Sequence, residues 1–290
     1  MVHSLRPRRS ALYLPAANAR AVAKARTLPA DVVILDLEDA VAPDQKIAAR
    51  AAAVAAIGEG GYGRRELVAR VNGIGTPWGR DDLAAIAAAG PDAVLVPKVS
   101  TPEEIRAYDQ ALAQSPKGTR LWIMIETCAC VPVLHQLAAC ATETRLAGFV
   151  IGTNDLAKEM RARLTADRAA FLPILTMAVA AARAHGLVVL DGVCNEFRDT
   201  AIVRTEAEQG RQFGFDGKTL IHPDQIAPCN AAFSPDPDEI AWARAVEHAF
   251  ALPENAGKGA IKVEGQMVEL LHREQARQIL AIAAAISADT

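Results

Sequence analysis

The sequence predicts a (β/α)8 barrel followed by a C-terminal extension, and three observations support this α/β fold class. Eight short apolar segments alternate with Ala-rich amphipathic stretches through residues 1–233. The apolar segments are nearly continuous, as parallel strands buried on both faces are. Eight such strand–helix units close into a barrel. No Gly-x-Gly-x-x-Gly pattern follows the first segment, so a dinucleotide-binding open sheet is disfavoured.

The expected strands and helices follow one another without a low-complexity linker. In order, the strands are residues 10–16, 31–39, 66–73, 93–99, 121–127, 146–152, 188–193 and 215–222. An amphipathic stretch follows each strand. The stretch over residues 43–61 opens at a proline and closes at glycines, the usual limits of a helix. After residue 100, Thr101 and Glu104 have the spacing of a capping box.

Residues 234–290 differ in character from the barrel. They predict a turn and a helix, a loop, a short hairpin turning at Glu264 and Gly265, and a final amphipathic helix. This extension has too few apolar residues for an independently stable core. We therefore expect it to pack on the barrel or on a neighbouring subunit.

Composition excludes several classes of protein. Lys+Arg number 31 against 34 Asp+Glu, for a formal net charge of -3, so nucleic-acid binding is disfavoured. No uninterrupted apolar run approaches the roughly 18 residues of a membrane span, and the start lacks a signal-peptide pattern. Five cysteines without a C-x-x-C favour small buried hydrophobes over a disulfide framework, and Cys128 and Cys130 are a weak metal pair. These features predict a cytoplasmic enzyme.

Charged and polar residues follow the ends of seven of the predicted strands. In a barrel these carboxyl ends converge on one mouth, where barrel enzymes place their chemistry. Each of these residues taken alone would be interpreted as a solvated charge on a loop. Because the strand ends converge, the group as a whole is better explained as a functional site. The residues are Asp36, Glu38, Asp39, Arg70, Asn72, Lys98, Glu126, Asp155, Asp191, Lys218 and His222.

Two carboxylates predict a metal site. Glu126 ends an apolar strand on the same face as Trp122 and Met124, where an unpaired carboxylate is costly unless a cation neutralises it. Asp155 follows the next strand around the barrel. A pair of carboxylates without nearby His or Cys suits Mg²⁺, with water and substrate completing the coordination. The alternative is that Asp155 caps the helix that it precedes.

Two further residues have open readings. The planar guanidinium of Arg70 suits a substrate carboxylate, but Arg70 could also pair with Asp36 or Glu38, and both readings could hold at once. His222 precedes a proline and is expected to hydrogen-bond a loop rather than to act in catalysis.

Seven sequence blocks resemble one family. RSALYLP (9–15), LDLEDAVAPDQKIAAR (35–50), VARVNG (68–73), VPKV (96–99), MIET (124–127), GTNDL (152–156) and GFDGKTLIHPDQI (214–226) are similar to those of the citrate lyase β-subunit-like acyl-CoA lyases of the HpcH/HpaI aldolase superfamily. The resemblance implies a TIM-like barrel, Mg²⁺ (with Mn²⁺ as an alternative ion), a CoA thioester and a 2-oxo acid as ligands, and a homo-oligomer, a trimer or hexamer.

The resemblance also implies roles for individual residues. Glu126 and Asp155 match the family's metal ligands, and Arg70 matches the arginine that binds the 2-oxo acid. Glu38 and Asp39 match an acidic pair that holds metal-bound water, and with Asp36 they would form an acidic wall beside Arg70. The remaining residues of the implied substrate and CoA site are Arg20 and Lys24, which would face CoA phosphates, and Lys98.

Two positions depart from the family pattern. Ala16 stands where the family usually has a glycine after the first strand, which affects the CoA contacts. Glu269 stands where many members have an aspartate that reaches a neighbouring subunit's site as an acid or base, and the proline that follows it in the family is missing here.

The expected reaction is a reversible, Mg²⁺-dependent retro-Claisen cleavage of a 3-hydroxyacyl-CoA such as malyl-, methylmalyl-, citramalyl- or citryl-CoA. Glu269 is the expected proton donor to the departing enolate. Lys98 is a second candidate, unless it pairs with Asp36 in the interior. Three alternatives stay open: a CoA thioesterase on the same site, an aldolase acting on free aldehydes, and a β subunit that works only with an acyl-carrier partner.

Overall fold

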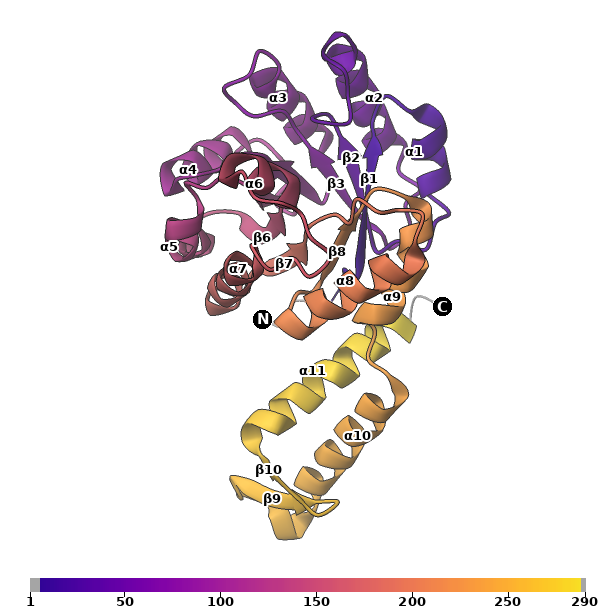
Figure 1. The fold of residues 1–290 in the computed structure, drawn as a ribbon, viewed down its shortest axis with the longest axis vertical. Helices are drawn as coiled ribbons and strands as arrows, with labels where there is room; N and C mark the ends of the chain where they lie inside the picture. Colours follow the sequence, from indigo (N-terminus) through magenta and orange to yellow (C-terminus); the bar gives the residue numbers. More distant parts are fainter. Residues whose placement is uncertain (1–5, 288–290) are drawn as a thin grey trace. The chain divides into compact units, whose positions relative to one another are not determined.

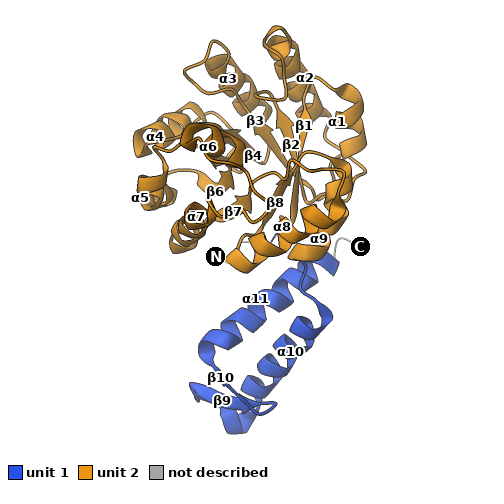
Figure 2. Ribbon diagram, viewed as in Figure 1, with its two compact units in different colours: residues 1–7, 234–290 blue, residues 8–233 orange. Residues whose placement is uncertain are grey.

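The computed structural model describes residues 6–287 and divides them into two compact units. One unit contains Arg8–Phe233, and the other contains residues 6–7 and 234–287 (Figure 2). Within the described residues, no helix is both long and apolar enough to cross a membrane.

The larger unit is a closed barrel of eight parallel strands in chain order, which confirms the predicted (β/α)8 fold (Figure 1). The strands are β1 (Ser10–Pro15), β2 (Val32–Asp36), β3 (Glu66–Arg70), β4 (Ala93–Val96), β5 (Arg120–Ile125), β6 (Leu146–Ile151), β7 (Val188–Asp191) and β8 (Gly217–Leu220). β8 pairs with β1 and closes the ring. The register places Asp36 of β2 opposite Arg70 of β3.

Helices follow the strands and surround the barrel (Figure 1). They are α1 (Ala19–Ala25), α2 (Lys46–Glu59), α3 (Gly79–Ala89), α4 (Pro102–Ala111), α5 (Leu134–Ala139), α6 (Thr153–Met160), α7 (Leu172–Ala184), α8 (Thr200–Phe213) and α9 (Ile226–Phe233), with single 3-10 turns η1 (Pro43–Gln45), η2 (Val131–Val133), η3 (Cys140–Thr142) and η4 (Pro223–Gln225). The capping box predicted for Thr101 and Glu104 is present at α4.

The barrel has two apolar layers, and strand alternation assigns residues to them. An inner cluster includes Ile34, Val68 and Met124, whereas a larger cluster lies between the strands and the helices. Because side chains alternate along a strand, the inward face continues from these three residues to Asp36, Arg70 and Glu126. The inner face of the barrel therefore ends in charged residues at its carboxyl-terminal end.

The smaller unit is a helical hairpin with a short antiparallel sheet. Its elements are α10 (Pro237–Ala251), η5 (Pro253–Asn255), β9 (Ala260–Val263), β10 (Gln266–Glu269) and α11 (Leu270–Ser287). The hairpin turns at Glu264 and Gly265 as predicted, with φ values of 47° and 86°. Positive φ at both central residues is the geometry that continues strand twist through a two-residue turn. The unit has a small apolar cluster of its own, which includes Val246, Phe250 and Ala276.

Candidate active site

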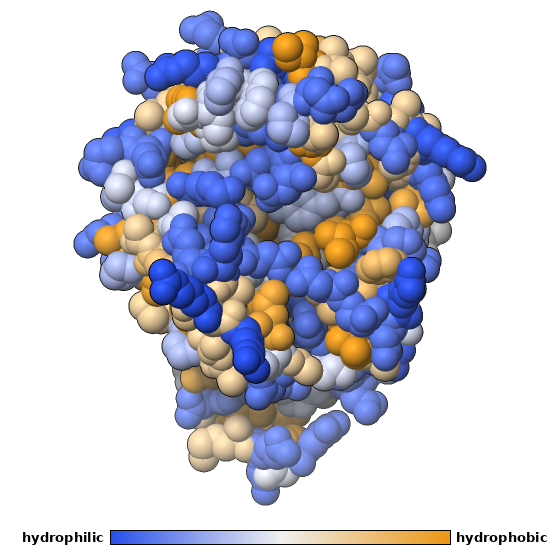
Figure 3. Space-filling view, turned by 45° about the horizontal axis from the view of Figure 1, so that its top comes forward, coloured by the Kyte–Doolittle hydropathy of each residue, from blue (hydrophilic) through white to orange (hydrophobic). Residues whose placement is uncertain are grey.

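The candidate site is the carboxyl-terminal end of the barrel, called here the mouth. Its charged residues come from β2, β3, α6 and the loops after β2, β4 and β5; they are Asp36, Glu38, Asp39, Arg70, Lys98, Glu126 and Asp155. Figure 3 shows a hollow near the centre of the presented face, bordered mostly by hydrophilic residues and on one side by apolar ones.

Arg70 is held by the acidic residues that follow β2. Its Nε and Nη2 donate to the two oxygens of Asp36 at 2.7 and 2.6 Å, in a two-pronged pair. Its Nη1 lies 3.1 Å from Glu38 Oε2 and 3.4 Å from Asp39 Oδ2. Two fixed contacts to a fully buried carboxylate orient the guanidinium plane. The structural reading of Arg70 is therefore confirmed, and its role toward a substrate stays a prediction.

Glu126 is buried at the end of β5 in a space that Gly152 leaves open. Its Oε1 accepts a hydrogen bond from the backbone N–H of Lys98 at 2.8 Å. A Cβ at position 152 would lie 2.5 Å from the Cβ of Glu126 and 2.6 Å from its Oε2. The glycine of the GTNDL block is thus required by the carboxylate on the neighbouring strand.

Asp155 lies in the first turn of α6, and Lys98 connects it to the rest of the mouth. Lys98 Nζ is 3.8 Å from Asp155 Oδ2 and 3.1 Å from Glu38 Oε1. Two of the alternative readings are excluded here. The N-cap of α6 is Gly152, so Asp155 is not the cap. Lys98 pairs with Glu38 and Asp155 rather than with Asp36, because Arg70 already occupies both oxygens of Asp36.

The mouth is unfavourable for negative charge. Burial raises the pKa of Glu126 from 4.5 to about 8, and repulsion from Glu38 adds to the effect. Burial also raises the pKa of Glu38, more than Arg70 lowers it. Burial lowers the pKa of Lys98, but the carboxylates of Glu38 and Glu126 outweigh it, so this pKa is raised. A further cation would therefore be favoured at the mouth.

Sequence reasoning missed Lys46, which holds the loop after β2. Its Nζ donates to the carbonyl oxygens of Leu37 and Glu38 at 2.8 and 2.6 Å. It also donates at 2.8 Å to Asn72, whose amide donates to the Leu37 carbonyl at 2.9 Å. A lysine at the first residue of a helix opposes the helix dipole. This unfavourable position was the sequence feature that could have singled out Lys46. Asn72, predicted to lie at the mouth, instead supports the loop after β2.

Tyr13 was also missed, and it forms the floor beneath Arg70. The Arg70 guanidinium lies over its ring at 4.8 Å, and its hydroxyl is 3.5 Å from the sulfur of Met124. Burial holds the pKa of Tyr13 well above its ordinary value of 10. Tyr13 lies two residues after the inward residue Ala11 along β1, so strand periodicity could have identified it.

Asp191 and Lys218 do not belong to the mouth, contrary to expectation. Asp191 accepts from Arg168 Nη1 at 2.8 and 2.7 Å and from Lys218 Nζ at 2.9 Å. Lys218 is 3.1 Å from Glu206 of α8, and both Asp191 and Lys218 are fully buried. Leu190 points into the barrel, so its neighbour Asp191 points outward. These residues form an ionic cluster between the barrel and α8.

Four predicted residues remain: His222, Arg20, Lys24 and Glu269. His222 Nδ1 accepts from the backbone N–H of Asp224, so this histidine caps a turn, as predicted. Arg20 and Lys24 are exposed, one turn apart on α1. Glu269 is exposed at the end of β10, and its N–H donates to His272 at 2.9 Å. The substrate roles of these three charged residues stay predictions.

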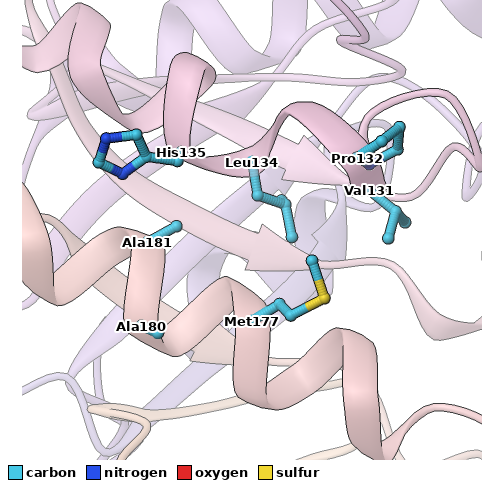
Figure 4. Close-up of a pocket in the computed structure, with 7 residues that line it drawn as sticks. All are labelled: Val131, Pro132, Leu134, His135, Met177, Ala180 and Ala181. Atoms are coloured by element: carbon cyan, nitrogen blue, oxygen red, sulfur yellow. The ribbon is translucent and has the colours of Figure 1, made fainter.

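Two other features of the larger unit have no part assigned to them. A pocket between η2, α5 and α7 is lined by Val131, Pro132, Leu134, His135, Met177, Ala180 and Ala181 (Figure 4). Its lining is almost wholly apolar, so we do not assign chemistry to it. All five cysteines are free, and all but Cys128 are buried.

The donor set of the mouth fits a hard divalent cation. Glu126 and Asp155 offer carboxylate oxygens, which Mg²⁺ prefers, and Glu126 is buried with a raised pKa as expected of a carboxylate that lacks a strong cation. Across residues 6–287 there is no cluster of three or more His, Cys, Asp or Glu positioned for a metal. A pair of protein ligands is the pattern that Mg²⁺ takes when water and substrate supply the other positions.

The fold and the mouth together define an α/β-barrel enzyme. A family model described as HpcH/HpaI aldolase/citrate lyase matches residues 9–223, so the chain belongs to this family. This confirms the resemblance that the sequence blocks indicated.

Several known proteins are similar over almost the whole chain. A (3S)-malyl-CoA thioesterase of Cereibacter sphaeroides strain KD131 is 48% identical over 288 residues, covering 99% of each chain. The mitochondrial citramalyl-CoA lyase of Homo sapiens is 30% identical over 300 residues, covering 98% of this chain and 88% of that one. A crystal structure of CitE from Mycobacterium tuberculosis in complex with magnesium, acetoacetate and coenzyme A has a TM-score of 0.78 at 30% identity, covering 97% of this chain and 100% of that chain.

Proposed function

We propose that the protein is a cytoplasmic, Mg²⁺-dependent enzyme that acts on a CoA thioester of malyl-CoA type and hydrolyses the thioester. The observation that supports the metal-dependent chemistry is that Lys98 at the barrel mouth contacts both carboxylates, Glu126 through its backbone N–H and Asp155 through its ammonium. Full-length similarity to a malyl-CoA thioesterase supports hydrolysis as the main outcome. The second candidate is the C–C lyase expected from the sequence, supported by the similarity to citramalyl-CoA lyase.

Each residue of the mouth has a distinct part in this proposal. Glu126 and Asp155 would hold the metal, and Glu38 and Asp39 would orient water around it. When bound, Mg²⁺ supplies Lewis-acid stabilisation of negative charge on oxygen. Arg70, fixed by Asp36, would bind the carboxylate of the acyl group. A rigid guanidinium is suited to this because its orientation is set before the substrate arrives.

The two candidate outcomes differ in the bond that breaks. Hydrolysis adds water to the thioester carbonyl, breaks the C–S bond and protonates the CoA thiolate. Lyase cleavage removes the hydroxyl proton, breaks a C–C bond and delivers a proton to the acyl-CoA enolate. Both outcomes need an acid or base beyond Arg70. We propose Glu269 from a neighbouring subunit of a trimer or hexamer for this role, with Lys98 as the second candidate.

Two cations on α1 are proposed to contact the CoA moiety. Arg20 and Lys24 would face the CoA phosphates, since both are exposed cations beyond β1.

Two substrate tests separate this enzyme from the aldolase and from the carrier-dependent β subunit. Activity of the isolated protein on free acyl-CoA would exclude a β subunit that depends on an acyl-carrier partner. Activity on free aldehydes without CoA would favour an aldolase instead.

A panel of CoA thioesters with and without Mg²⁺ tests the proposal. From malyl-CoA, hydrolysis yields free CoA and malate, whereas C–C cleavage yields acetyl-CoA and glyoxylate. We expect free CoA to predominate in the wild type and activity to be lost in EDTA and in Glu126→Gln. Glu103→Gln is the matched control, because it removes one exposed carboxylate that pairs with Arg106 on α4. Full Mg²⁺-dependent activity in Glu126→Gln would overturn the metal assignment, and predominant acetyl-CoA would favour the lyase.

A further inference from the structure

Lys98 contacts carboxylates from three different parts of the mouth. Its backbone N–H donates to Glu126 Oε1 at 2.8 Å. Its Nζ lies 3.1 Å from Glu38 Oε1 and 3.8 Å from Asp155 Oδ2. One residue thus connects the loop after β2, the loop after β5 and the first turn of α6.

The backbone at Lys98 is unusual for a residue with a side chain. Its φ is 55°, in the left-handed region. Glycine adopts this conformation without strain, and a lysine does so at an energetic cost. The strained backbone directs the N–H to Glu126, and a glycine could do the same. A glycine could not, however, make the contacts of the Lys98 side chain with Glu38 and Asp155.

We propose that the Lys98 ammonium is a tethered cation that balances the acidic mouth in the metal-free protein and gives up Asp155 when Mg²⁺ binds. The inference rests on the metal role of Glu126 and Asp155 proposed above. No covalent bond changes: the ion pair of Asp155 with Lys98 is exchanged for one with Mg²⁺, while Glu38 retains the ammonium. Lys98 is accordingly a charge-balancing residue, whose ammonium offsets the repulsion among the carboxylates of the mouth before the metal arrives.

Competition for Asp155 has two opposite consequences. The ammonium reduces repulsion among the carboxylates, so it stabilises the metal-free protein. The same ammonium opposes an incoming dication, so it weakens Mg²⁺ binding. Removing it should therefore lower the stability of the metal-free protein and raise its affinity for Mg²⁺, by about tenfold for one like-charge contact in a hydrated site.

The test is thermal unfolding of the full chain in EDTA and in a series of Mg²⁺ concentrations, because a ligand raises Tm according to its affinity. Lys98→Gly removes the ammonium, keeps the N–H that binds Glu126 and suits the left-handed backbone. Lys98→Asn repeats the test with a side chain that also accepts this backbone. Lys158→Ala is the matched control, since Lys158 is an exposed lysine on the same helix as Asp155.

We expect both Lys98 variants to respond to about tenfold less Mg²⁺ than the wild type, with Lys158→Ala unchanged. Their Tm in EDTA combines the lost ion pairs, which lower it, with the relieved left-handed strain, which raises it. Equal or weaker Mg²⁺ affinity in the Lys98 variants, beside clear binding by the wild type, would overturn the tethered-cation role alone. No Mg²⁺ response in any of the proteins, wild type included, would overturn the metal site and this inference with it.

Discussion

The buried carboxyl group of Glu126 makes the metal-free protein less stable as pH rises. The residue is 1% exposed, and burial together with the Glu38 carboxylate raises its pKa from 4.5 to about 8. The folded protein therefore keeps this proton over a pH range in which the unfolded chain has lost it. Stability then falls with rising pH between about 4.5 and 8, because the folded state binds more protons there.

The size of this effect follows from the pKa difference. Each pH unit in that window costs about 1.4 kcal/mol, so the whole window lowers the free energy of unfolding by roughly 3–5 kcal/mol. Glu126→Gln removes the ionisation and keeps an oxygen that accepts from the Lys98 N–H. We expect the variant to gain roughly 3–5 kcal/mol over the wild type on going from acid to pH 8.5.

Urea unfolding followed by circular dichroism, in EDTA at pH 5, 6.5 and 8.5, measures this difference. Glu103→Gln is the control, because this side chain is 77% exposed and its loss should leave the pH profile unchanged. An equal stability difference between Glu126→Gln and the wild type at all three pH values would contradict the raised pKa of Glu126. That result would mean that the carboxyl group titrates alike in the folded and unfolded chains.

Four further predictions concern the residues of the mouth and the buried ionic cluster of Asp191. Because Glu126 must lose its proton to bind a cation, Mg²⁺ affinity measured by calorimetry should fall about tenfold per pH unit below 8, and a pH-independent affinity would contradict this. Gly152→Ala should reduce Mg²⁺-dependent turnover by about 100-fold, because its Cβ would lie 2.5 Å from that of Glu126, and wild-type kcat would show that the mouth tolerates the methyl group. Arg70→Lys should lower kcat/KM by about 100-fold, since a lysine cannot reproduce the two-pronged pair with Asp36. A loss below tenfold would argue against a role of Arg70 in binding the substrate. Asp191→Asn should reduce the free energy of unfolding, measured in urea, by roughly 3–5 kcal/mol, because it leaves two buried cations without their carboxylate. The kcat of the folded enzyme should stay unchanged. A stable variant with an altered kcat would indicate that Asp191 acts in the active site.

Period-two alternation predicted the inward position of the Glu126 carboxylate correctly. Trp122 and Met124 belong to the inner cluster, and Glu126 continues their face. Alternation from Leu190, which the structure places in the inner cluster, puts Asp191 on the outward face, and alternation from Ala11 puts Tyr13 on the inward face. Which residues of one strand share a face follows from their order in the sequence.

The sequence by itself determined the barrel and its eight strands, because near-continuous apolar runs that alternate with amphipathic stretches are local properties of the chain. Only the tertiary structure decided which groups meet. The left-handed backbone of Lys98 brings its N–H to Glu126 and its ammonium to Glu38 and Asp155. Gly152 leaves room for a carboxylate 26 residues earlier in the chain. Such contacts join loops from different strands, and their geometry depends on backbone angles and register that no single segment specifies.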